Sequence, residues 1–194
     1  MNNDFYSKNS VSFFEDTVNV DLTDLYLPFI SCLPNKAKVL DAGCGSGRDA
    51  LAFLRMGYQV DAFDASAEMV KLASDLTGIN VHQKRFEDIK VVNHYDGIWC
   101  CASLLHVPLS DLPKVMTKLA RALKTGGSWY ISFKYGNSER KKDGRHFTDL
   151  NEKLLKQLLT YIGNVKIITV WITEDLRPHR FDKWLNAILK KEVK

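Results

Sequence analysis

Residues 39–48 read Val-Leu-Asp-Ala-Gly-Cys-Gly-Ser-Gly-Arg, and they give the strongest indication of the fold. A short apolar segment ends in Asp41, and three glycines follow at alternate positions. Glycines at this spacing let the chain turn sharply from a strand into a helix, and they let a ligand lie against bare backbone. A second acid, Asp64, ends the next apolar segment 19 residues after Gly45. This is close to the roughly 20 residues expected of a nucleoside-binding βαβ unit, whose second acid holds the ribose hydroxyls.

Apolar residues on both sides of this turn recur with the periods of strands and helices. We expect strands at residues 58–64, 78–83, 95–102, 128–133 and 165–173, and helices at residues 48–56, 66–75 and 149–162 and from residue 110 to the glycines at 126–127. Residues 134–146 are expected to form a polar loop. Residues 181–191 have the propensity of a helix, but we interpret them as a closing strand antiparallel to its neighbour. This order predicts an α/β fold, with a Rossmann-like, doubly wound and mostly parallel sheet.

The length of 194 residues predicts a single domain with an ample hydrophobic core. Within residues 1–194, residues 1–35 are expected to form an N-terminal helical lid or cap, with Pro28 as a kink. Residues 37–194 are expected to form the Rossmann-like core.

Composition and charge exclude several classes of protein. Hydrophobic residues make up 45% and charged residues 26%, a globular balance that excludes a disordered or fibrous chain. The net charge of +4 permits an anionic ligand but is not the dense basic surface of a nucleic-acid binder. No apolar run approaches the ~20 residues that span a bilayer, and the N-terminus lacks a signal pattern. Because four cysteines are too few for a disulfide scaffold, we expect a cytoplasmic protein. From the charge and the short apolar runs we expect no nucleic-acid or membrane partner.

The glycine spacing distinguishes between two kinds of nucleoside ligand. A dinucleotide pyrophosphate is typical of G-x-G-x-x-G, whereas this chain has D-x-G-x-G-x-G. Asp41 would be a poor neighbour for a pyrophosphate. It suits a ligand with a cationic end, such as the ammonium and sulfonium of S-adenosylmethionine.

Further stretches share their order and spacing with one known family. They are residues 40–47 (LDAGCGSG), 86–88 (FED), 95–98 (YDGI) and 122–127 (ALKTGG). With Asp64, they make the chain resemble the class I S-adenosylmethionine-dependent methyltransferases from about Tyr6 to Lys191. Thr125 stands where that family's last turn usually has proline. Residues 47–50 (GRDA) and 102–108 (ASLLHVP) resemble small bacterial members, whose substrates are mostly unassigned.

The resemblance implies a seven-stranded sheet with the last strand antiparallel. It also implies methyl transfer from S-adenosylmethionine, with S-adenosylhomocysteine as the product. The predicted donor-binding residues are Asp41, Gly43, Cys44, Gly45, Arg48, Asp64, Ala65, Phe86, Glu87, Cys101 and Tyr6.

Several of these residues have an alternative reading. The guanidinium of Arg48 suits the methionyl carboxylate, or it is a solvated residue of the first helical turn. Phe86 stacks on the adenine or packs in the core, and Glu87 or Asp88 accepts from the adenine amino group or caps a turn. Cys101 borders the donor as a small buried residue rather than a nucleophile. Tyr6, with Phe14, covers the donor site or packs within an N-terminal helix.

No catalytic side chain is required by the predicted reaction, because the sulfonium itself activates the methyl group and positioning supplies much of the acceleration. His106, just past the fourth strand, is a candidate general base, and a structural loop histidine is the alternative. No metal site is predicted, since the cysteines and histidines lack ligand spacing.

The acceptor is expected to be a small anionic molecule. Loops that leave the carboxyl ends of parallel strands meet at the ligand, and two of them are basic. Lys134, Arg145 and Arg177 are the predicted acceptor residues, because arginine binds carboxylate or phosphate in a bidentate manner. Gly144 and Pro178 adjoin the two arginines and would aim them inward. The alternative is that these charges are only solvated.

Three other functions are alternatives to methyl transfer to a small molecule. A nucleotide-dependent oxidoreductase would need the other glycine spacing. A non-catalytic domain that binds S-adenosylmethionine would bind the donor without turnover. An adenine-N6 nucleic-acid methyltransferase has an Asn/Asp-Pro-Pro-Tyr/Phe motif after strand four, where this chain has residues 101–105 (CASLL). A monomer and a homodimer both remain open.

Overall fold

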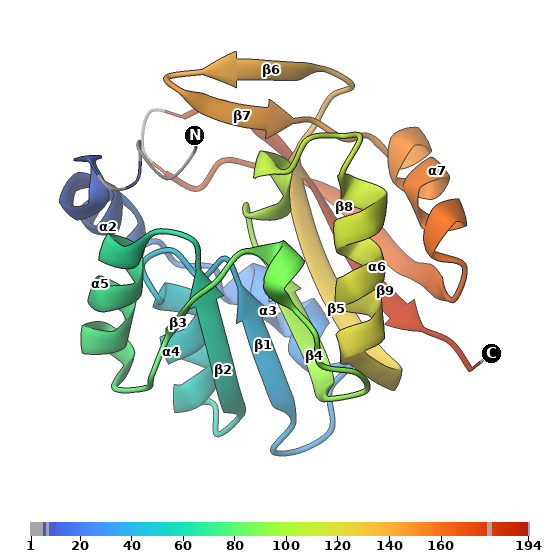
Figure 1. The fold of residues 1–194 in the computed structure, drawn as a ribbon, viewed down its shortest axis with the longest axis horizontal. Coiled ribbons are helices and arrows are strands. Elements are labelled where there is room, and N and C mark those ends of the chain that lie inside the picture. The colour runs from blue at the N-terminus through green and yellow to red at the C-terminus, as the bar shows by residue number, and fades with distance from the viewer. Residues whose placement is uncertain (1–5, 7, 178–179, 194) are drawn as a thin grey trace.

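The computed structural model describes residues 6, 8–177 and 180–193. Within these residues one sheet has seven strands in the order β3-β2-β1-β4-β5-β9-β8 (Figure 1). The strands are β1 (Lys38–Ala42), β2 (Gln59–Asp64), β3 (His82–Gln83), β4 (Tyr95–Cys100), β5 (Leu123–Lys134), β8 (Val165–Glu174) and β9 (Lys183–Lys191). β9 is antiparallel to both β5 and β8, and the pairs from β3 to β5 are parallel. The expected mostly parallel sheet with an antiparallel last strand is therefore confirmed.

Helices cover both faces of the sheet (Figure 1). They are α2 (Ser10–Val18), α3 (Thr23–Ile30), α4 (Arg48–Arg55), α5 (Ala67–Thr77), α6 (Leu112–Ala122) and α7 (Glu152–Ile162), with 3-10 turns η1 (Phe86–Asp88) and η2 (Leu104–His106). The boundaries follow local chemistry. Ser66 caps α5 by accepting from the Met69 N–H, and Pro113 stands in the first turn of α6.

The core lies on both faces of β4, as its continuous apolar sequence predicts. Ile98 packs with α6 and α7 on one face. On the other face Trp99 stacks on Tyr130, with ring centroids 3.7 Å apart, beside Phe29 of α3 and Phe53 of α4. These four aromatic side chains are fully buried. Because each contributes roughly 1.5 to 3 kcal/mol on burial, α3 is held firmly against the sheet.

The prediction of a polar loop at residues 134–146 is wrong. Residues 139–148 form a hairpin of β6 (Glu139–Lys142) and β7 (Arg145–Thr148). Asp143 and Gly144 at its tip have φ of 51° and 73°, the left-handed pair that favours Asp-Gly in a two-residue turn. The hairpin lies over the carboxyl ends of the parallel strands (Figure 1), where Thr148 Oγ1 donates to the carbonyl of Val107 at 2.8 Å.

Smaller corrections concern element ends. α6 ends at Ala122, before the glycines at 126–127, and β5 begins at once with Leu123. β4 ends at Cys100, and Ala102 takes a left-handed φ of 48° as the chain leaves the sheet. The division at residues 35–37 remains a prediction, because α3 shares its buried cluster with β1, β4, β5 and β9.

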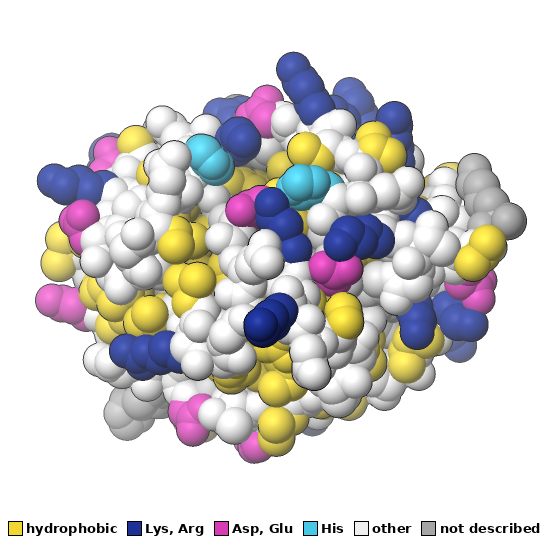
Figure 2. All heavy atoms as spheres, turned by 90° about the horizontal axis from the view of Figure 1, so that it is seen from below, with side chains coloured by type: hydrophobic (Ala, Val, Ile, Leu, Met, Phe, Trp, Pro, Cys, Tyr) yellow, Lys and Arg dark blue, Asp and Glu magenta, His cyan; other side chains and the backbone are white. Residues whose placement is uncertain are grey.

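The surface seen from below in Figure 2 carries Lys and Arg side chains scattered among acidic and apolar ones. On this face the coloured residues form no continuous basic stripe. Among the described helices, none is both long and apolar enough to cross a membrane.

Candidate functional site

A cavity of about 630 Å³ opens at the carboxyl ends of the parallel strands. The turns after β1, β2 and β4 line one side, and the β6–β7 hairpin with the β8–β9 connection lines the other. β1 lies between β2 and β4, so the strand order reverses at this point. Open α/β sheets bind their ligands at such a switch point.

The glycine turn after β1 presents backbone to this cavity. Gly43 has a φ of 78°, and a Cβ there would lie 2.6 Å from the Cβ of Ser103. Gly45 has a φ of 51° and no backbone neighbour within 4 Å of such a Cβ. Both residues line the cavity with Cys44. Gly43 is therefore required by packing, whereas Gly45 leaves open backbone for a ligand.

Asp64 lies at the end of β2 on the cavity wall. Its Oδ2 accepts from the Gly45 N–H at 2.9 Å, and its Oδ1 accepts from the Ser66 N–H at 2.9 Å. The Ala65 N–H also donates to this carboxylate. Burial raises the pKa of Asp64, and these three backbone donors oppose that rise. The carboxylate is thus held rigidly at the cavity, next to Ala65.

Asp41 lies behind the glycine turn and is 2% exposed, so it does not line the cavity wall. The Ala50 N–H donates to its carboxylate, while its Oδ2 has no hydrogen-bond partner among the described residues. Burial, and next the charge of Asp49, raise the pKa of Asp41 well above its ordinary value. A buried oxygen without a partner is costly, and a cation nearby would stabilise it.

Arg48 lines the cavity, but its guanidinium is already engaged. Its Nε and Nη2 donate to Asp49 at 2.6 and 3.1 Å, and its Nη1 donates to the carbonyl of Thr17 at 3.3 Å. Asp49 also accepts from Tyr26 Oη at 2.7 Å and from Trp99 Nε1 at 2.8 Å. Burial alone would raise the pKa of Asp49, yet Arg48 and these donors hold it below its ordinary value. A role for Arg48 in binding the methionyl carboxylate remains a prediction.

The residues predicted for the adenine lie in and beside the 3-10 turn η1, which follows β3. Phe86 lines the cavity and packs edge-on against Phe63, with ring centroids 5.5 Å apart. Glu87 is exposed at the rim. Asp88 instead caps η1, because its Oδ2 accepts from the Arg85 N–H at 2.9 Å. The capping alternative therefore holds for Asp88, whereas Glu87 is an exposed residue of the cavity lining.

The cavity cysteines are not reactive. Burial raises the pKa of the Cys101 thiol to about 12 and that of Cys44 well above its ordinary value. Ser132 Oγ donates to the sulfur of Cys101 across 3.9 Å. Both thiols stay protonated at neutral pH and line the cavity as small apolar groups.

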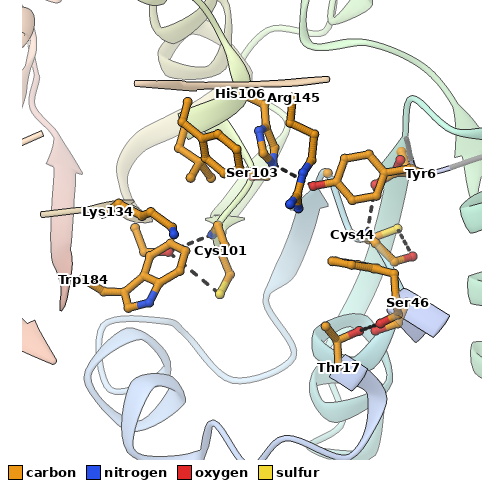
Figure 3. Close-up of a pocket in the computed structure, with 18 of the residues that line it drawn as sticks. Tyr6, Thr17, Cys44, Ser46, Cys101, Ser103, His106, Lys134, Arg145 and Trp184 are labelled. Atoms are coloured by element: carbon orange, nitrogen blue, oxygen red, sulfur yellow. Dashed lines mark hydrogen bonds between the residues drawn. The ribbon is translucent and has the colours of Figure 1, made fainter. Parts of the chain in front are cut away.

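His106 reaches the cavity from η2 and meets Tyr6 (Figure 3). Its Nδ1 is 2.7 Å from the carbonyl oxygen of His146, and its Nε2 is 2.8 Å from the hydroxyl of Tyr6. A carbonyl only accepts, so Nδ1 carries the proton and Nε2 accepts from Tyr6. Burial lowers the pKa of His106 to about 4, which keeps the imidazole neutral.

The predicted acceptor cations all line the cavity, and each has an acidic neighbour. Lys134 Nζ lies 2.6 Å from Asp182, and Arg177 forms a bidentate pair with Asp175. Arg145 lies 3.7 Å from Asp143 and over the ring of Phe147. Pro178, which was expected to aim Arg177, lies outside the described residues.

Sequence reasoning missed a set of polar residues on the cavity floor. The set comprises Tyr130, Ser132, Thr173 and Asn186. Asn186 is 1% exposed, accepts from Tyr130 Oη at 2.7 Å and donates to Thr173 Oγ1 at 3.0 Å. A lone asparagine in the apolar run of β9 was the available signal. Among the described residues, no group of three or more His, Cys, Asp or Glu side chains could hold a metal ion.

Comparisons with known proteins agree with this geometry. Residues 39–127 match the family model described as a methyltransferase domain. This stretch of the chain is therefore similar to methyltransferase domains. The matched residues include the glycine turn, Asp64 and Cys101, but the hairpin and the β8–β9 connection lie beyond them.

Curated relatives match about half of the chain. The ubiquinone biosynthesis O-methyltransferase of Xanthomonas oryzae pv. oryzae (strain PXO99A) is 33% identical over 103 residues, which are 50% of this chain and 42% of that protein. That of Xanthomonas axonopodis pv. citri (strain 306) is 35% identical over 106 residues, 51% of this chain and 44% of that protein. The chain thus spans less than half the length of these relatives.

Solved structures share the fold over nearly the whole chain. The 1,6-didemethyltoxoflavin-N1-methyltransferase of Burkholderia thailandensis, crystallised with its substrate and S-adenosylhomocysteine, has a TM-score of 0.78 at 22% identity and covers 98% of this chain and 86% of its own. The [4+2]-cyclase SpnF has a TM-score of 0.77 at 17% identity and covers 99% and 95%. Because one neighbour is named a cyclase, the fold of a methyltransferase domain does not by itself fix the reaction.

Residues at the cavity wall and directly behind it fit S-adenosylmethionine on three observations. Gly45 leaves bare backbone, Asp64 offers a fixed carboxylate to a ribose, and the unpaired Oδ2 of Asp41 favours a cation nearby. A pyrophosphate would gain nothing from two acids beside the turn.

Proposed function

We propose that the protein transfers the methyl group of S-adenosylmethionine to a small molecule. The observation that carries this proposal is the hydrogen bond from the Gly45 N–H to Asp64, which joins the bare turn and the ribose acid at one cavity. The bound donor supplies an electrophilic methyl group. The protein positions the donor through Gly43, Cys44, Gly45, Asp64, Ala65, Phe86 and Glu87 and shields the acceptor from water.

Turnover tests this proposal against a domain that only binds S-adenosylmethionine. The full chain is incubated with methyl-labelled donor and a metabolite extract, and labelled products are identified by mass spectrometry. A labelled small molecule that disappears in the Gly45→Val variant supports the proposal. Donor binding without any labelled product would favour the non-catalytic alternative.

We further propose that the acceptor carries an anionic group. Lys134, Arg145 and Arg177 line the same cavity. Lys134 lies 2.6 Å from Asp182 and Arg177 lies 2.6 Å from Asp175, so each of these two pairs is close to neutral. Arg145 is the preferred acceptor residue, because its acid, Asp143, is 3.7 Å away and 59% exposed. A screened pair of this kind releases its cation to a ligand at little cost.

Variants of the two arginines test the acceptor proposal. Arg145→Ala is expected to raise the KM for the acceptor about tenfold or more, whereas Arg177→Ala has a smaller effect because Asp175 already pairs with it. Arg121→Ala, in the last turn of α6 and outside the cavity lining, is the control. Equal KM values in all three variants, or an acceptor that is cationic or neutral, would refute it.

We also propose that the protein works in the cytoplasm, as a monomer or a homodimer. All four of its cysteines are free thiols, including the adjacent Cys100 and Cys101. Light scattering of the purified chain distinguishes the two oligomeric states.

A further inference from the structure

The hydroxyl group of Tyr6 lies inside the cavity and contacts the side chains of the acceptor side. It lies 2.8 Å from His106 Nε2, and the side chain of Arg145 also hydrogen-bonds to it. Figure 3 shows His106 and Arg145 both reaching toward this hydroxyl. A phenol side chain of the protein therefore stands between an unprotonated nitrogen and a guanidinium.

The imidazole of His106 is built to receive a hydroxyl proton. The carbonyl of His146 fixes the proton on Nδ1, at 2.7 Å, so Nε2 offers a lone pair. The ring is buried beside Phe147, with ring centroids 5.0 Å apart, which holds its orientation. An Nε2 lone pair held in this way selects a ligand that donates a hydrogen bond.

The surroundings of the Tyr6 ring suit an aromatic ring. Phe13 meets it edge-on, with centroids 5.1 Å apart at 84°, and the His106 ring lies at 5.7 Å and 71°. Edge-to-face packing of this kind favours an aromatic guest over an aliphatic one of similar size. Burial raises the pKa of Tyr6 despite the opposing effect of Arg145, so its hydroxyl stays protonated and donates.

We propose that His106 Nε2 and Arg145 form a subsite for the hydroxyl group of a phenolic acceptor, and that Tyr6 occupies this subsite until the acceptor displaces it. This inference rests on the proposed function and names its substrate class. Tyr6, which the sequence predicts as a donor-binding residue, then belongs to the acceptor side of the cavity.

The reaction in this subsite is a direct methyl transfer. The phenol oxygen forms a bond to the methyl carbon while the bond between the methyl carbon and sulfur breaks. The electron pair of the broken bond stays on sulfur, which becomes a neutral thioether. The phenol proton passes to His106 Nε2 and then to water. A base with a low pKa suffices, because the phenol oxygen becomes strongly acidic as the methyl group bonds to it.

The test uses 4-methylphenol, which reproduces the Tyr6 side chain from Cβ to the hydroxyl, and toluene, which lacks the hydroxyl. Tyr6→Ala removes the ring and the hydroxyl of that side chain. Calorimetry with S-adenosylhomocysteine present measures both ligands on the full chain. Tyr6→Ala is expected to bind 4-methylphenol about tenfold tighter than toluene, and the wild type is expected to bind it about tenfold more weakly than the variant does. With S-adenosylmethionine, the same variant should form 4-methoxytoluene.

Two further variants separate hydrogen bonding at Nε2 from a structural role of His106. In the Tyr6→Ala background, His106→Asn keeps a donor to the His146 carbonyl but has no atom at the Nε2 position, whereas His106→Gln places a polar atom there. The preference for 4-methylphenol over toluene should be lost in the first and largely kept in the second. Equal preference in both variants, or none in Tyr6→Ala, would overturn the proposal.

The affinity for S-adenosylhomocysteine is measured first in every variant. If Tyr6→Ala loses about tenfold or more of that affinity and shows no preference for 4-methylphenol, Tyr6 belongs to the donor site and the phenol subsite is refuted. If the wild type does not bind S-adenosylhomocysteine at all, the proposed function fails instead.

Discussion

The backbone N–H of Gly45 donates a 2.9 Å hydrogen bond to Oδ2 of Asp64. This bond joins the turn after β1 to the end of β2, which are 19 residues apart in the chain. The open backbone of Gly45 and the Asp64 carboxylate are therefore one rigid unit and not two independent groups. A change at either residue is expected to disturb the donor site as a whole.

Asp64→Ala should weaken binding of S-adenosylhomocysteine more than tenfold, because a charge-assisted hydrogen bond is worth roughly 1.5 to 3 kcal/mol. The variant also leaves three backbone N–H groups without their acceptor, so its melting temperature should fall too. Calorimetry and thermal melts measure both effects. Asp61→Ala is the matched control, since Asp61 lies on the same strand but pairs with Lys38 outside the cavity. Unchanged affinity in Asp64→Ala would refute the ribose assignment.

Gly45→Ala should lose donor affinity while losing little more stability than a control glycine does. Gly45 and Gly78 have φ of 51° and 74°, and a Cβ at either position meets no backbone atom within 4 Å. Each alanine is expected to cost about 1 to 2 kcal/mol of unfolding free energy, because both backbones are left-handed. Gly78 ends α5 and does not line the cavity, so Gly78→Ala should bind S-adenosylhomocysteine normally. Equal affinities in the two variants would place the ligand elsewhere.

Asp41→Asn should stabilise the free protein and weaken donor binding. The pKa of Asp41 is raised in the native state, so that state binds more protons than the unfolded chain as pH rises above about 4. The wild type therefore loses stability over this range, and the neutral asparagine removes that loss. Urea unfolding at several pH values measures the difference, which should grow with pH. A variant that is less stable than the wild type at pH 8 would contradict the assignment.

His106 should remain neutral well below its ordinary pKa of 6.5, with the proton on Nδ1. The unfolded chain takes up a proton on this residue below pH 6.5, whereas the native state does so only near pH 4. Stability should therefore fall as the pH drops through this window, by up to about 3 kcal/mol. Nitrogen-15 NMR of the imidazole reports the tautomer and the pKa. His106→Gln should lack this part of the pH dependence, and a native pKa near 6.5 would contradict the expectation.

The parts of the site that lie close together in sequence could be predicted from it. The glycine turn, Asp64 and the buried strand at residues 95–100 follow from local spacing and apolar runs. The hairpin at residues 139–148 was missed because its strands are rich in charged residues. Its Asp143-Gly144 turn was the local signal, but without an apolar alternation the flanks did not indicate strands.

The network around Asp49 could not be predicted from local patterns. Tyr26 and Trp99, which donate to Asp49, lie 23 and 50 residues away in the chain. Packing of α3 against β4 brings them together, and no periodicity encodes that contact. The same holds for Tyr6 and His106, which are 100 residues apart. Arg48 was predicted as a ligand contact, whereas its guanidinium pairs with the adjacent Asp49, which packing holds beside Tyr26 and Trp99.

Calorimetric titration of the wild-type chain with S-adenosylhomocysteine and with NAD tests the central claim most directly. The bare turn at Gly45, the acid at Asp64 and the unpaired oxygen of Asp41 predict saturable one-to-one binding of S-adenosylhomocysteine and no heat of binding with NAD. Binding of NAD without binding of S-adenosylhomocysteine would contradict the account.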